Sequence, residues 1–136
     1  NLVLFCFWSA QFETEVADDD WDKILAFSNR WKSQVVQPLR DVRTWMKVNS
    51  DNSADEKGVR FSTLRERIKM DELAAEKFQQ DQIAELVPYL LSAEVNFNGE
   101  VAQSNFKKLL RAQSLEYVED MDRQLDRIAQ AINKSA

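Results

Sequence analysis

Basic residues in the middle of the chain have a spacing that could bind an anion. Arg40, Arg43 and Lys47 recur at steps of three and four residues, which places them on one face of a helix. More basic residues follow a short polar linker, and two antiparallel helices joined there would bring both sets to one end of the pair. Such a cluster can bind a phosphate, a carboxylate ligand or an RNA backbone. The candidate residues for binding an anion or a partner are Arg40, Arg43, Lys47, Arg60 and Arg67.

The same region also allows a purely structural interpretation. Glu72 falls on the apolar stripe between Ile68 and Ala75, and a buried carboxylate is costly unless it is paired. Glu76 lies one helical turn further on. The basic residues could therefore form ion pairs on a solvated face and have no ligand at all. The candidate members of this structural polar network are Glu72, Glu76 and Arg65.

Composition excludes several kinds of chemistry. The chain has no histidine, which rules out histidine-based triads and histidine-ligated zinc. Its two glycines, Gly58 and Gly99, are too few for a glycine-rich phosphate loop. The single cysteine, Cys6, stands among apolar residues and is expected to be a buried, inert thiol. We predict no metal and no cofactor. A net charge of -5 argues against nonspecific duplex binding over the whole surface, although a local basic patch could still bind.

Apolar residues at steps of three and four predict helices over residues 21–46, 59–86 and 104–132. Pro38 lies inside the first of them and predicts a kink or break near Val35 to Gln37. Asn98-Gly99 is a weak signal for a β-hairpin, but its flanks are short, so we predict a turn in the connection before the last helix. The tryptophans are expected to pack in a core, and only Trp45, beside basic residues, has the setting of a base-stacking residue.

The segment Asn1 to Trp8 (N-L-V-L-F-C-F-W) is apolar after its first residue, so other helices must cover it. It is far shorter than the roughly 20 apolar residues of a membrane-spanning helix. A signal peptide is the alternative, but no basic residue precedes the segment. We therefore predict one all-α domain over residues 1–136, a bundle of four to five helices around this central helix. The missing initiator Met suggests that residues upstream of Asn1 are absent from this sequence.

Three segments carry a family resemblance. Asn1 to Trp8, Trp31 to Arg43 (W-K-S-Q-V-V-Q-P-L-R-D-V-R) and Ile68 to Glu76 (I-K-M-D-E-L-A-A-E) resemble, in this order, an uncharacterised proteobacterial family, domain of unknown function 2390. The resemblance reaches about Leu86, and the middle segment is its most specific part. It implies a further helix before residue 1, and it implies no activity or cofactor. It draws attention to four motif positions, which are Arg40, Arg43, Glu72 and Glu76.

We predict from these patterns a small cytoplasmic interaction module without enzymatic activity, and the family resemblance implies that it is bacterial. Its polar feature would be a network of Arg40 and Arg43 with Glu72 or Glu76. A protein partner or a second copy would dock on the N-terminal apolar region. The alternative is RNA- or ribosome-associated binding through the basic patch. An enzyme that uses paired carboxylates ranks third, since Glu72 and Glu76 would need environments that push their pKa values apart.

Overall fold

The computed structural model describes residues 2–50, 56–92, 96–118 and 120–135, and it confirms the all-α prediction. No strand occurs in these ranges, and an isolated bridge joins Phe12 to Asn96. Since α2 and α3 are continuous, the helices form five separate segments, within the predicted four to five. No helix in the described ranges is long and apolar enough to cross a membrane. The α-helices are α1 (Leu2–Ser9), α2 (Asp18–Trp31), α3 (Gln37–Val48), α4 (Glu56–Leu86), α5 (Gly99–Ala112) and α6 (Asp120–Ser135).

Contacts divide the chain into two compact units, and the single-domain organisation stays a prediction. We call Asn1–Leu25 with Ile83–Ala136 the core unit, and Ala26–Gln82 the hairpin unit. The boundaries between the units fall within α2 and α4.

The core unit is built around the apolar N-terminal segment. Phe5 packs edge-on against Trp21 at 5.9 Å between ring centroids, and both are buried together with Cys6. The buried amide of Asn105 donates to the Ser9 hydroxyl and accepts from the Val16 backbone N–H, each over 2.9 Å. Because every polar group of this bridge has a partner, it ties α5 to α1 at little desolvation cost. The cover of α1 is incomplete, since Val3 and Leu4 are exposed.

The prediction of one long helix over residues 104–132 is wrong, because two helices, α5 and α6, occupy the region. Ser114 adopts a left-handed conformation (φ 56°) at the end of α5. Its N–H bonds to the Arg111 carbonyl, and the Leu115 N–H bonds to the Leu110 carbonyl. This is a Schellman-type helix ending, usually made by glycine. With serine at that position, the sequence carries no visible stop signal.

The turn predicted at Asn98-Gly99 is also wrong, because these residues begin α5. The Asn98 side chain accepts hydrogen bonds from the backbone N–H groups of Glu100 and Val101, at 2.9 and 3.3 Å. An asparagine in that role is a helix N-cap. The same dipeptide suits both a turn and a cap, and here the cap prevails.

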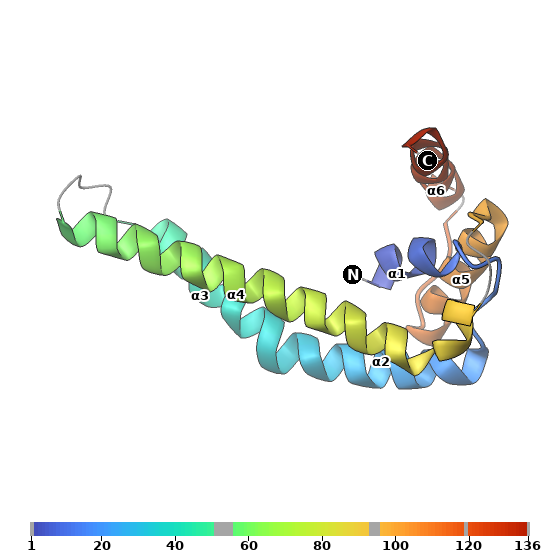
Figure 1. Ribbon diagram of the computed structural model, residues 1–136, viewed down its shortest axis with the longest axis horizontal. Coiled ribbons are helices and arrows are strands. Elements are labelled where there is room, and N and C mark those ends of the chain that lie inside the picture. Colours follow the sequence, from blue (N-terminus) through green and yellow to red (C-terminus); the bar gives the residue numbers. More distant parts are fainter. Residues whose placement is uncertain (1, 51–55, 93–95, 119, 136) are drawn as a thin grey trace. The chain divides into compact units, whose positions relative to one another are not determined.

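The hairpin unit consists of two antiparallel helical arms, with the end of α2 and α3 on one side and α4 on the other (Figure 1). Near the boundary with the core unit, the Trp31 indole N–H donates to the Ala75 carbonyl over 2.9 Å and its ring packs on Phe78. The buried Gln79 amide donates to the hydroxyl of Ser28 over 2.7 Å. Further along, Val36 and Met46 are buried.

The irregularity predicted near Val35 to Gln37 is present as a π-helical turn, Lys32–Val36, in which the Gln37 N–H bonds to the Lys32 carbonyl. Pro38 follows at once and cannot donate the next bond. The turn takes up one extra residue, which rotates the downstream helix back by about 100°. In an uninterrupted helix Arg43 would lie about 120° from Trp31. The π turn therefore brings Trp31 and Arg43 to the same side, facing α4.

Replacing Ser114 by glycine tests the ending of α5. We expect Ser114→Gly to raise the free energy of unfolding by about 0.5–1 kcal/mol, because glycine adopts positive φ without strain. The matched control is Ser62→Gly on the exposed face of α4, which should lower stability by roughly 0.3–0.5 kcal/mol. Urea denaturation measures both, and a loss of stability in Ser114→Gly would contradict this account.

Candidate functional site

The candidate site is a cluster of two arginines and two glutamates between α3 and α4. Glu72 stands at its centre with only 7% of its side chain exposed. Arg40 Nε donates to Glu72 Oε1 over 3.0 Å, and Arg43 Nε donates to Glu72 Oε2. Both carboxylate oxygens are thereby occupied by guanidinium donors. The buried acid that the sequence places on the α4 stripe thus has its partners on the facing helix.

Glu76 extends the cluster towards solvent. Arg40 Nη2 donates to Glu76 Oε1 over 2.5 Å, so Arg40 bridges two carboxylates one turn apart on α4. The exposed fractions of the side chains are 42% for Arg40, 30% for Arg43 and 23% for Glu76. With two positive and two negative groups, the cluster is formally neutral.

Hydrogen bonding sets the protonation state of the cluster. The pKa of Glu72 lies below its usual value, chiefly because Arg43 and then Arg40 hydrogen-bond the carboxylate, although burial opposes this shift. The pKa of Arg40 is raised, mainly by its hydrogen bond to Glu72. A general acid near neutral pH needs a carboxyl pKa shifted upward instead. Glu72 is therefore a fixed anion.

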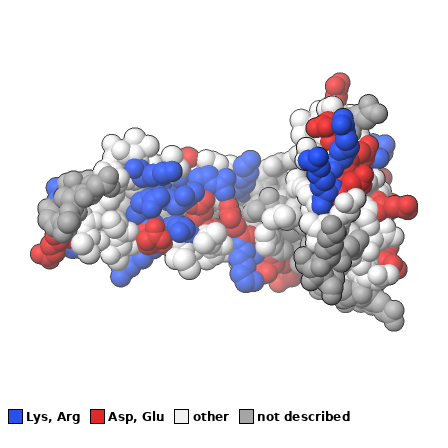
Figure 2. Space-filling model, turned by 90° about the horizontal axis from the view of Figure 1, so that it is seen from above, with Lys and Arg blue, Asp and Glu red and all other residues white. Residues whose placement is uncertain are grey.

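The other predicted site residues do not join this cluster. Arg65 pairs with its neighbour Glu66 at 3.3 Å, and its Nε is buried with no hydrogen-bond partner in the described ranges. Arg60 pairs with Glu56 one turn away on α4. Lys47 and Arg67 are exposed and have no ion pair within the part of the chain that the structure describes. Figure 2 shows acidic side chains interspersed among the basic ones over the hairpin unit.

The prediction that Trp45 packs in a core is wrong, because 62% of this residue is exposed. A hairpin of two helices has one buried seam, and the seam here runs through Met46 and Val36. The sequence pattern showed apolar residues on several sides of the helix and could not show that a single neighbour covers it. Val42, one turn earlier, is 47% exposed.

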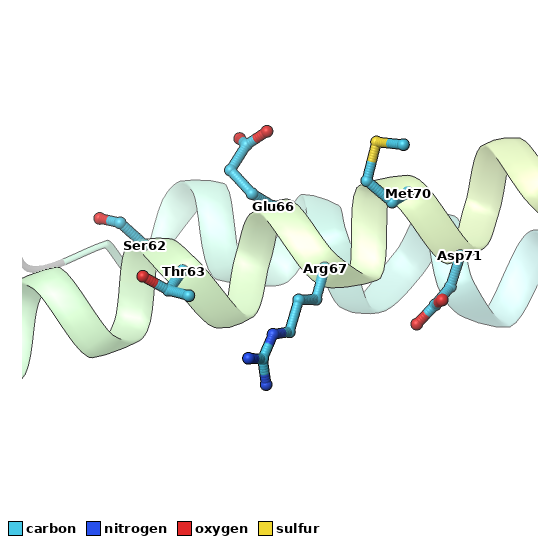
Figure 3. Close-up of a pocket in the computed structure, with 6 residues that line it drawn as sticks. All are labelled: Ser62, Thr63, Glu66, Arg67, Met70 and Asp71. Carbon is cyan, nitrogen blue, oxygen red and sulfur yellow. The ribbon is translucent and has the colours of Figure 1, made fainter.

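A hollow of about 580 Å³ is lined by residues of α4 alone, namely Ser62, Thr63, Glu66, Arg67, Met70 and Asp71. Glu66 and Met70 point to one side of the helix, while Arg67 and Asp71 point to the other (Figure 3). The lining groups therefore diverge and do not meet on one bound molecule. A second hollow of about 350 Å³ in the core unit is lined mainly by charged residues at the start of α2 and the end of α5.

Among the described residues, no three acids or cysteines lie close enough together to hold a metal ion. Burial raises the pKa of the Cys6 thiol to about 12, so it stays protonated and unreactive. The hairpin unit carries an ion cluster and several exposed apolar side chains.

A comparison with protein families identifies the family to which the chain belongs. Residues 1–83 match the model of a protein family of unknown function, DUF2390, and the chain belongs to that family. The match includes α1 and all four members of the arginine–glutamate cluster. No curated protein and no solved structure shows significant similarity to the chain.

Removing the charge of Glu72 should destabilise the protein. We expect Glu72→Gln to lower the free energy of unfolding by about 1–3 kcal/mol, because Arg40 and Arg43 lose their charged acceptor. The matched control, Glu66→Gln on the exposed side of α4, should change it by less than about 0.5 kcal/mol. A double-mutant cycle with Arg43→Ala should show coupling, and purely additive losses would mean that the pair does not interact.

Acid should abolish the contribution of Glu72. A carboxyl group with a lowered pKa in the folded state contributes stability above its unfolded pKa, here 4.5, and loses it as the pH falls through the folded value. The stability difference between the wild type and Glu72→Gln should therefore be full at pH 7 and shrink as the pH falls below about 4.5. Urea denaturation at stepped pH measures it, and a difference that is constant down to pH 3 would contradict the ion-pair account.

Proposed function

We propose that the protein is a non-enzymatic interaction module that binds a protein partner through one flank of its hairpin. The observation that carries this proposal is the exposure of Trp45. Large aromatic side chains are rarely so exposed on a soluble helix without a reason, and tryptophan is enriched among the residues that dominate binding energy.

The docking face is an apolar flank that we define as Val42 and Trp45 of α3 with Leu64 and Phe78 of α4. These residues are 47%, 62%, 51% and 44% exposed. Each lies about 120–160° around its helix from the ion pair of Arg40 and Glu76. Since that pair marks one side of the line where α3 meets α4, the four residues lie on the other side.

The ion cluster supports this face from behind. It fixes the register between α3 and α4, so the apolar residues of the two helices keep one arrangement before any partner arrives. Preorganisation of this kind lowers the entropy that binding must overcome. The cluster itself offers little to an anionic ligand, since Nε and Nη2 of both arginines already donate to Glu72 or Glu76.

RNA- or ribosome-associated binding has less support. Of the five candidate cations, Arg40, Arg43 and Arg60 are in ion pairs, which leaves Lys47 and Arg67. The hairpin unit holds 11 Lys and Arg against 9 Asp and Glu, a formal charge of only +2. Affinity for nucleic acid grows with the number of phosphates neutralised, so this surface would bind RNA weakly. Docking on the N-terminal apolar region, and a cytoplasmic location, stay predictions.

Quantitative affinity purification with matched variants tests the proposal. We expect proteins captured by the wild type to be depleted at least about tenfold by Trp45→Ala, because the substitution removes the largest side chain of the apolar flank. The control is Met70→Ala on α4, a residue that is also 62% exposed but lies off the flank.

Circular dichroism should first show that both variants keep the helical content of the wild type. Equal capture by wild type and Trp45→Ala would contradict a docking role for the flank. If the wild type captures RNA, and Lys47→Ala captures less of it, the RNA alternative would be favoured instead.

A further inference from the structure

The stripe of α4 that carries Leu64 and Phe78 also holds two opposite charges. Leu64, Arg67, Asp71 and Phe78 follow one another at steps of three, four and seven residues, so they share one side of the helix. The close-up shows Arg67 and Asp71 both pointing to the same side, opposite Glu66 and Met70 (Figure 3). Neither Arg67 nor Asp71 has an ion-pair partner within the described ranges of the chain.

The charged pair of this stripe is complementary to itself. If two α4 helices lie antiparallel with their midpoint near residue 69, Arg67 of each copy faces Asp71 of the other. A two-fold contact makes every such pairing twice, as interfaces between identical subunits do. Resting on the proposed docking role of the apolar flank, we infer that its partner is a second copy of this chain.

The exposed area of the flank suits a weak dimer. Fully buried aromatic side chains contribute about 150–250 Å² each, so the half-exposed Trp45 and Phe78 offer roughly 200 Å² per copy. With the half-exposed Val42 and Leu64, the apolar flank offers up to roughly 400 Å² per copy. With a polar rim that includes Arg67 and Asp71, two copies would together bury slightly more than about 1,000 Å². That is near the lower limit for a specific interface, and we expect dissociation at micromolar concentrations.

Solution mass measured against concentration tests this inference, for example by sedimentation equilibrium of the whole chain from about 1 to 200 µM. The wild type should pass from monomer to dimer in this range. Leu64→Glu should raise the dimer dissociation constant at least about tenfold, because it puts a charge in the interface. The matched control is Leu73→Glu, since Leu73 is 50% exposed on the same helix but off the flank, and it should dimerise like the wild type.

Charge reversal gives a second readout that does not depend on the apolar residues. Arg67→Asp and Asp71→Arg should each weaken the dimer about five- to tenfold, because like charges then meet across the interface. The double variant restores opposite charges and should return to within about threefold of the wild type. Circular dichroism of each variant establishes that it is folded.

Several results would overturn the inference. The first is that the wild type stays monomeric up to 200 µM. The second is that Leu73→Glu disrupts the dimer and Leu64→Glu does not. The third is that the double charge variant has a dimer dissociation constant no lower than those of the single variants. A monomeric chain whose captured proteins are still lost in Trp45→Ala would overturn the dimer and leave the docking role of the flank intact. Unchanged capture together with a monomeric wild type would overturn both.

Discussion

The hairpin depends on one buried carboxylate. Glu72 is almost fully removed from solvent, and an ionised acid in that setting is tolerated only when donors surround it. Arg40 and Arg43 supply those donors from the facing helix. A slip of α3 against α4 by one turn would break the present arrangement, in which Glu72 accepts hydrogen bonds from both Arg40 and Arg43. The cluster therefore favours the present register of α3 against α4.

The other features of the hairpin are consistent with this constraint. The π turn before Pro38 rotates α3 so that Arg43 faces the same helix as Trp31, which packs on Phe78 and bonds to Ala75. Without the extra residue of that turn, the arginines and the tryptophan could not both reach α4. The arrangement also leaves the apolar flank uncovered, because a pair of helices buries side chains only along the line where the two helices meet. The exposed Val42 and Trp45 are a direct result of that geometry.

Much of the fold could be predicted from the sequence, because apolar spacing reports helices well. The position of Glu72 on the α4 stripe, and its need for an arginine partner, also followed from spacing and the cost of a buried charge. Spacing did not reveal the partner of Arg65, since residues seven apart on one helix share a face without meeting the same neighbour. Its partner is Glu66.

Three features were out of reach for specific physical reasons. The end of α5 is made by Ser114 in a conformation typical of glycine, so no residue type announces it. The buried Asn105 looks like any surface amide until its two partners, Ser9 and Val16, are brought to it from distant parts of the chain. The exposure of Trp45 depends on how many helices cover α3, which apolar periodicity does not encode.

The central claim is that the Glu72 cluster sets the register of α3 against α4. It is tested most directly by the distance between spin labels at Thr44→Cys and Lys69→Cys, one on each helix, with Cys6 replaced by serine and the measurement made by pulsed electron resonance. We expect one narrow distance distribution with Glu72 present, and a broadened or shifted distribution in Glu72→Gln. An equally narrow distribution at the same distance in Glu72→Gln would contradict it.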